Sequence, residues 1–363
     1  MSVSESTPAT ARPTATAATV IPAPRRLGRP GRWLVAGVVL GLALLTGVMV
    51  GPAGLTPGAV LTELVGALPG VHLDSGLTTQ QQAILWQIRL PRVMLGVIVG
   101  ATLAVSGAAY QGVFRNPLAD PYLLGVSAGA GLGATLALTQ DGVIGSLGVP
   151  LLAFAGGMLA VAATYALGAS VGGHRSSTII VLAGVAVAAF FSAVQTFVQQ
   201  WFDDSLLAVY SWMLGRLSTN GWADIVMVLP YVTLSWVLLL LHRRTLDVLA
   251  VGDVEAASLG IDVPRVRLIL VLTATLGTTA VVSVSGLIGF VGIIVPHAVR
   301  LVFGASHRLL LPMSMLFGAS FLVLADVAAR SVVAPAELPI GVVTALVGAP
   351  FFLVVLRRNR GVS

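Results

Sequence analysis

The stretch of this sequence that most resembles a catalytic motif is GVSAG at residues 125–129, which matches the G-x-S-x-G pattern of serine hydrolases. That pattern makes a nucleophile only where a strand enters a sharp turn, with a histidine and an acid beside the serine. Of the five histidines, only His297 falls within an apolar run rather than in a predicted loop or at the end of a span. Glycines at this spacing also let membrane helices approach closely. We therefore expect Ser127 to serve helix packing, and a membrane serine protease is the weaker alternative.

The composition predicts the setting in which these residues lie. The chain is 56% hydrophobic and only 9% charged, against about 25% charged residues in an ordinary soluble domain. Cysteine is absent, which excludes disulfides, thiolate metal sites and cysteine nucleophiles. All 20 basic residues are arginine, so the chain has no lysine for a Walker A motif. We expect an all-α polytopic membrane protein with no metal site, no cofactor and no catalytic residue, in which ATP is hydrolysed by another chain.

The apolar runs predict about ten transmembrane helices. Residues 1–24 are rich in Ala, Thr, Ser and Pro and are expected to form a disordered tail, which leaves 25–363 as the membrane domain. Most runs reach the length of about 20 residues that a helix needs to cross a bilayer. The runs are 33–50, 93–113, 122–139, 149–171, 178–200, 222–241, 266–303, 309–329 and 338–356. Because 266–303 is too long for one span, we divide it near 283–286.

The arginines predict the orientation, since arginine-rich segments stay in the cytoplasm. Both chain ends and the loop 242–267 carry arginines, so this topology places them in the cytoplasm and the protein in the cell membrane. Only Arg89, Arg92, Arg216 and Arg330 fall on the outer side, against 16 on the cytoplasmic side. This asymmetry accounts for the net charge of +6 without a nucleic-acid partner.

Several long motifs resemble those of the permease subunits of ABC importers for iron-siderophores, haem and cobalamin. The resemblance extends from residue 84 to 356. Its motifs are FRNPLADPYLLGVSAGAGLG (114–133), RLPR (89–92), YSWMLGRL (210–217), LGIDVPR (259–265), GLIGFVGIIVPHAVRL (286–301), HRLLLPMSMLFGASFLVLADVAAR (307–330) and AELPIGVVTALVGAPFFLVVL (336–356). The family implies a cobalamin-importer-permease-like bundle of ten spans. It also implies four kinds of partner: a second permease subunit, two ATP-binding-cassette ATPase subunits, an extracytoplasmic substrate-binding protein and the lipid bilayer.

The resemblance also implies roles for individual residues. The ATPase coupling element would contain Glu255, Ala256, Ala257 and Gly260. The cytoplasmic gate would contain Asn116, Leu118, Ser177 and Thr178. The docking arginines for the binding protein would be Arg89, Arg92 and Arg330. Simpler interpretations remain open: a capped loop helix at 253–260, helix capping by Asn116, and arginines that snorkel at helix ends. The role of Arg216 stays open.

The resulting functional prediction is the permease of an ATP-driven importer for iron-siderophore or haem, which works by alternating access. A cobalamin importer is the alternative within the family. An ion-coupled secondary transporter would need carboxylates inside its spans, and Asp326 is the main acid in that position. The sequence leaves open which chelate is carried and whether the second subunit is a copy of this chain or a paralogue.

Overall fold

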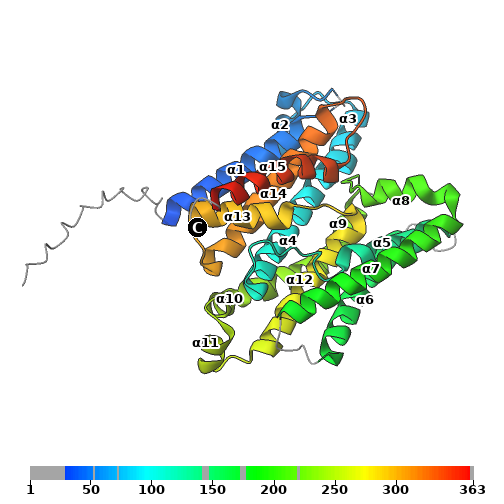
Figure 1. The fold of residues 1–363 in the computed structure, drawn as a ribbon. Helices are drawn as coiled ribbons and strands as arrows, with labels where there is room; N and C mark the ends of the chain where they lie inside the picture. Colours follow the sequence, from blue (N-terminus) through cyan, green and yellow to red (C-terminus); the bar gives the residue numbers. More distant parts are fainter. Residues whose placement is uncertain are drawn as a thin grey trace, which may run out of the picture.

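The computed structural model describes residues 29–51, 54–71, 73–140, 147–171, 177–218 and 221–359, and these residues form an assembly of helices (Figure 1). The predicted tail 1–24 lies outside them. In chain order the α-helices are α1 (Arg29–Met49), α2 (Pro57–Gly66), α3 (Thr79–Ala83), α4 (Leu90–Phe114), α5 (Val126–Leu138), α6 (Gly148–Ser170), α7 (Ser177–Trp201), α8 (Leu206–Met213), α9 (Trp222–Leu241), α10 (Arg243–Leu249), α11 (Asp253–Ser258), α12 (Val263–Ser285), α13 (Val291–Phe303), α14 (His307–Ser331) and α15 (Ile340–Asn359). A π-helical turn, Ile84–Arg89, joins α3 to α4.

Ten apolar helices correspond to the ten predicted spans. Within the described residues, seven are long and apolar enough to cross a membrane, and three more are apolar but shorter. The predicted division of 266–303 is confirmed, because α12 ends at Ser285 and α13 begins at Val291. The two shortest, α5 and α13, have 13 residues each, or about 20 Å of helix at 1.5 Å per residue. Each follows a non-helical segment, and such a segment is tolerated at membrane depth only where protein or a wet cavity surrounds it.

Helix α4 is the centre of the bundle. It is the most buried of the long spans, and it packs against α9, α12, α13 and α14. Two contacts are so close that only glycine fits. A Cβ on Gly100 would overlap the carbonyl of Gly318 in α14, and one on Gly107 would overlap the carbonyl of Gly292 in α13. The small residues of α4 therefore set the distances between these helices.

Two groups of helices flank this centre. Figure 1 shows α1, α13, α14 and α15 on one side and α5, α6, α7 and α8 on the other. In the second group, α5 meets α6 through Gly129, Gly133 and Gly156, at which a Cβ would overlap backbone of the facing helix. Ser127 lies in the first turn of α5, not in a strand-to-helix turn. Gly129 of the GVSAG stretch thus packs closely against α6, as the packing interpretation expects, and the role of Ser127 itself stays a prediction.

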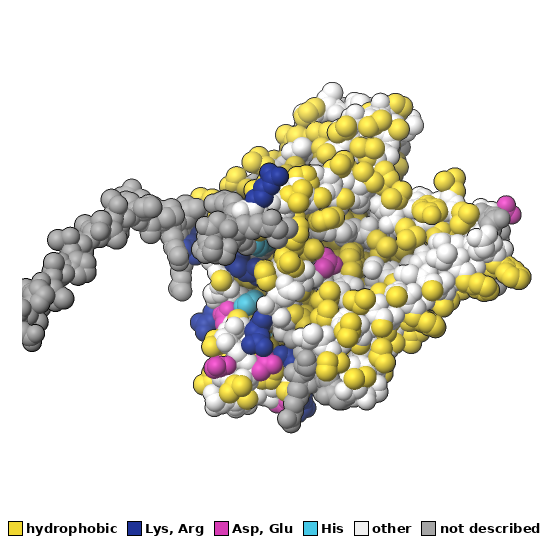
Figure 2. Space-filling model, viewed as in Figure 1, with side chains coloured by type: hydrophobic (Ala, Val, Ile, Leu, Met, Phe, Trp, Pro, Cys, Tyr) yellow, Lys and Arg dark blue, Asp and Glu magenta, His cyan; other side chains and the backbone are white. Residues whose placement is uncertain are grey.

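Charged side chains gather at one end of the bundle. Figure 2 shows basic and acidic side chains over the end that carries α10 and α11, whereas hydrophobic side chains cover much of the remaining visible surface. This end includes the loop 242–267, and it also holds Arg32, whose guanidinium donates to the carbonyl of Phe303. The positive-inside rule predicts that it faces the cytoplasm. We call it the inner end and the opposite one the outer end.

The contact at Gly107 predicts a steric effect that can be measured. Gly107→Ala should lower the thermal stability of the purified protein, because the added methyl meets rigid backbone; overpacking of this kind costs about 1 to 3 kcal/mol. Gly37→Ala in α1 is the matched control, since nothing lies within 4 Å of a Cβ there. Equal melting temperatures for the two variants in detergent would contradict the tight contact.

Candidate functional site

One hydroxyl group joins the two non-helical segments inside the bundle. The first segment, 115–125, precedes α5, and the second, 286–290, precedes α13. The Tyr122 hydroxyl donates to the carbonyl of Ile288 (3.1 Å) and accepts from the amide of the same residue (3.2 Å). The Tyr122 amide in turn donates to Asp120 Oδ1 (2.8 Å). Backbone groups that have no helical partner are thus satisfied by side chains.

A third non-helical segment, 214–218, is hydrogen-bonded to the end of α12, next to segment 286–290. The Arg216 amide donates to the carbonyl of Ser285 (2.8 Å), at the end of α12. The carbonyls of Leu214 and Gly215 accept from the first two residues of α15, Gly341 and Ile340 respectively. Gly215 has φ +74°, a conformation that favours glycine. These bonds connect α8, α12 and α15 at one junction.

The predicted gate residues occupy two stretches of chain, segment 115–125 and the start of α7. Asn116 and Leu118 are both exposed, and the Asn116 side chain accepts from the Leu118 amide (2.9 Å) in a local turn. Thr178 is exposed in the first turn of α7. Ser177 begins that helix, and its side chain lies outside the described residues. The end of segment 115–125 packs on α7, where a Cβ on Gly184 would come within 2.7 Å of the Leu123 carbonyl.

The predicted coupling element is a short helix at the inner end. Helix α11 contains Glu255, Ala256 and Ala257; Ala256 is fully buried, whereas the other two are exposed. Gly260 follows with φ +83°, and its amide donates to the Ala257 carbonyl (2.9 Å). Val251, Val254 and Leu259 expose more than two thirds of their surface around this helix. The element is therefore anchored on one side and apolar on the other.

Asp253, the first residue of α11, connects this element to the bundle. Its carboxylate lies 3.3 Å from the guanidinium of Arg115, the residue that ends α4 and begins segment 115–125. It also accepts from Arg267 of α12, whose side chain is buried (3.0 Å). The sequence alone predicts only a capped loop helix at 253–260 and an excess of arginines on the cytoplasmic side, without a connection between the two. The signal that could have suggested this ion pair is the combination of an acid at the start of a loop helix, Asp253, with an arginine at the end of a transmembrane helix, Arg115.

The three predicted docking arginines are not free surface charges. Arg89 and Arg330 are each 4% exposed and donate to carbonyls at the end of α1, Arg89 to Val48 and Arg330 to Gly47. Arg92 donates to both carboxylates of its neighbourhood, Asp326 (2.8 Å) and Glu337 (2.9 Å).

Asp326 is the centre of this outer network. Its side chain is 3% exposed, and it also lies 3.2 Å from Arg330 Nε. The acid on which an ion-coupled transporter would rely is therefore already paired with two arginines. The docking role of Arg89, Arg92 and Arg330 stays a prediction, but all three have internal bonds that hold α1, α4 and α14 together.

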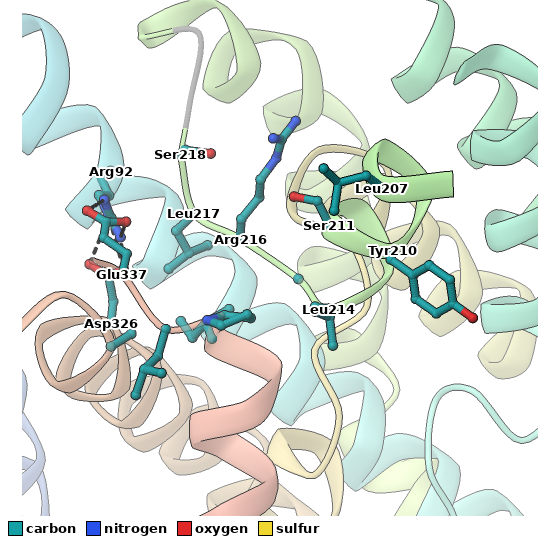
Figure 3. A pocket seen from close by; sticks show the side chains of 15 residues that line it. Arg92, Leu207, Tyr210, Ser211, Leu214, Arg216, Leu217, Ser218, Asp326 and Glu337 are labelled. Carbon is teal, nitrogen blue, oxygen red and sulfur yellow. Dashed lines mark hydrogen bonds and ion pairs between the residues drawn. The ribbon is translucent and has the colours of Figure 1, made fainter. Parts of the chain in front are cut away.

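A hollow opens beside this network at the outer end (Figure 3). It has a volume of about 320 Å³ and is lined by Arg92, Asp326, Glu337 and residues of α8, of segment 214–218 and of the chain entering α15. Within the residues that the structure describes, no group of three or more His, Asp or Glu side chains could hold a metal ion. The lining of this hollow therefore offers charged groups, hydrogen-bonding groups and apolar side chains.

The comparison with known proteins agrees with this arrangement. The FecCD transport family matches residues 39–358, which include all three non-helical segments and α11. The chain belongs to the FecCD transport family. The cobalamin import system permease protein BtuC of Halobacterium salinarum is 42% identical, over 89% of this chain and 94% of its own. The hemin transport system permease protein HmuU of Yersinia pestis is also 42% identical, over 75% and 83%.

Another relative is named for a different iron chelate. The Fe(3+) dicitrate transport system permease protein FecD of Escherichia coli is 39% identical, over 76% of this chain and 86% of its own. A solved inward-facing structure assigned to the metal-chelate type of ABC transporter matches with a TM-score of 0.78 at 30% identity, over 91% of this chain and 99% of its own. This FecCD chain is thus a multi-pass membrane protein of the permease class.

The junction at Tyr122 predicts a specific loss of stability. Tyr122→Phe keeps the ring but removes both bonds to Ile288, so it should destabilise the protein by about 1 to 3 kcal/mol. Tyr231→Phe is the control, because Tyr231 is exposed and packs on Phe154 through its ring. Thermal unfolding in lipid nanodiscs measures both variants. A Tyr122→Phe protein as stable as the control would show that the hydroxyl contributes nothing.

The outer network predicts an asymmetry between its two carboxylates. Asp326→Asn should cost about 3 to 5 kcal/mol, because it leaves buried arginine charge uncompensated. Glu337→Gln should cost only about 0 to 1 kcal/mol, since the Glu337 side chain is 46% exposed. Both substitutions keep the size of the side chain, so melting temperatures compare charge alone. Equal losses would mean that burial of Asp326 does not govern the network.

Proposed function

We propose that this FecCD protein is the permease subunit of an ATP-binding-cassette importer that carries a metal chelate into the cytoplasm by alternating access. The observation that supports it most strongly is the continuous family match over residues 39–358. The substrate is an iron-siderophore or haem, and cobalamin is the alternative, in line with the names of the relatives described above. The protein lies in the cell membrane with both termini in the cytoplasm, as the arginine distribution favours.

ATP hydrolysis is supplied by two separate ATPase subunits that dock on α11. Its exposed apolar side chains, Val254 and Leu259 among them, suit the groove of a protein partner. The bond from Asp253 to Arg115 supplies a direct path from this helix to segment 115–125, where Asn116 and Leu118 form part of the gate. Closure of the ATPases then displaces α11, and the ion pair carries that displacement to the gate.

A second permease subunit and a binding protein complete the importer. Phe190, Phe197, Trp201 and Leu207 expose apolar surface along α7 and α8, and this face packs against a second subunit, a copy of this chain or a paralogue. The binding protein docks at the outer end. Of the three predicted docking arginines, Arg92 is the most accessible, with a side chain 14% exposed against 4% for Arg330. We therefore expect the binding protein to contact Arg92 and its exposed partner Glu337 before it contacts the buried Arg89 and Arg330.

Transport in a reconstituted system tests the proposal. Proteoliposomes that contain this chain, its ATPase and its binding protein should accumulate a ferric siderophore, hemin or cobalamin only when ATP is present. Gly260→Pro should lower this uptake at least about tenfold, because proline cannot adopt the φ of +83° that ends the coupling element.

The outer-side variant Gly70→Pro is the control, since Gly70 has the same φ and open space around it. It should retain most uptake. Accumulation without any ATPase would refute the importer function. Equal uptake by the two proline variants would refute the coupling role of α11 alone.

A further inference from the structure

Arg216 differs from the other arginines of the outer end. Arg89, Arg92 and Arg330 are buried or nearly so and are bonded to carbonyls or carboxylates. Arg216 is exposed, and among the described residues its guanidinium makes no hydrogen bond or ion pair. Figure 3 shows its side chain extending away from segment 214–218, between Ser211 and Ser218. It is a cation with its full hydrogen-bonding capacity available.

Two adjoining hollows meet at this side chain. The first is the hollow of about 320 Å³ described above, and the second, of about 360 Å³, lies between α5, α6, α8 and α12. Ser211, Arg216 and Ser218 line both. Each is within the range of about 300 to 1,000 Å³ that is typical of small-molecule sites. The volume and concavity therefore favour a small molecule as the occupant.

The acids that line these hollows do not neutralise Arg216. Asp326 and Glu337 are already paired with Arg92. Asp224, in the second hollow, is 8% exposed and has an interaction of its own. The nearest uncommitted polar groups are the hydroxyls of Ser211 and Ser218, which can donate to the same ligand. The shared wall of the hollows thus presents one positive charge and neutral donors.

The backbone that carries Arg216 is held firmly. Its own amide is bonded to the Ser285 carbonyl (2.8 Å), and the preceding Gly215 accepts from Ile340 (3.3 Å). Any Cβ on Gly286 would overlap the carbonyl of Trp212, so the chain below the hollow has no room to relax. A cation on a fixed support loses less freedom when it binds, which favours affinity. Apolar side chains, Leu214 and Ile340 among them, complete the wall.

We propose that Arg216, with the hydroxyls of Ser211 and Ser218, binds a carboxylate or similar oxyanion of the transported small molecule at the outer mouth of the path. A guanidinium grips a carboxylate through two parallel charge-assisted hydrogen bonds. The apolar wall takes the uncharged part of the same molecule. The inference rests on the proposed import function and narrows its substrate to chelates with a free anionic group.

Direct binding tests this site without ATP or partner subunits. The full-length chain in nanodiscs is titrated with ferric citrate, which carries carboxylates, and with ferrioxamine B, whose iron is held by hydroxamates and whose net charge is positive. Wild type should bind ferric citrate more tightly at low salt than at high salt. Arg216→Gln should weaken that binding at least about tenfold and reduce the salt dependence, while binding of ferrioxamine B stays unchanged or strengthens. Arg216→Lys should be intermediate, because it keeps the charge and loses the paired geometry.

Arg308→Gln is the matched control, since it removes the same charge from an exposed position at the inner end. It should bind both probes as wild type does. Equal binding of ferric citrate by Arg216→Gln and wild type would overturn the proposal, as would a wild type that binds neither probe. Loss of binding-protein affinity without loss of chelate binding would also overturn it, because Arg216 would then be a docking contact. Failure of ATP-dependent uptake by wild type, with the titration as expected, would instead refute the import function alone.

Discussion

The strongest constraint on this fold is that backbone groups inside a membrane must find hydrogen-bond partners within the protein, and the bonds between the Tyr122 hydroxyl and the Ile288 peptide help to meet it. A bilayer has no water to pair with the backbone of an interrupted helix. This chain nevertheless interrupts its helices at 115–125 and 286–290, and one hydroxyl serves as both donor and acceptor between them. Segment 214–218 is bonded beside the same junction through Ser285. Arg216 and two of the predicted gate residues, Asn116 and Leu118, lie in these non-helical segments.

Both ends of α4 are fixed by a carboxylate that bridges two arginines. At the outer end, Asp326 pairs with Arg92, near the start of α4, and with Arg330. At the inner end, Asp253 pairs with Arg115, just after α4, and with Arg267. At the inner end one carboxylate faces two guanidiniums, which leaves net positive charge, whereas at the outer end Glu337 supplies a second carboxylate to Arg92. The central helix is thus tied to α14 at its outer end and to α11 at its inner end.

Sequence reasoning reached the architecture because hydropathy and the positive-inside rule act locally. The ten apolar segments, the break after Ser285 and the packing role of the GVSAG stretch all follow from short windows of sequence. The bonding of Arg92 could not be predicted, because Asp326 lies 234 residues away in the chain. The ion pair of Arg330 with Asp326, four residues apart, was within reach of a helical-spacing argument. The role of Tyr122 was missed because its partner, Ile288, lies 166 residues away in the chain, and no local pattern of sequence predicts which distant group a hydroxyl will bind.

The glycine contacts of α4 restrict how the flanking helices α13 and α14 can move. Where Gly100 faces Gly318 and Gly107 faces Gly292, backbone meets backbone, and a longitudinal slip would drive a side chain into a carbonyl. Such a contact behaves mechanically as a pivot: it resists shear along the axis but permits a small rocking angle about the point of touch. The motion of α13 and α14 against α4 is therefore limited to a small rocking about these two points of contact.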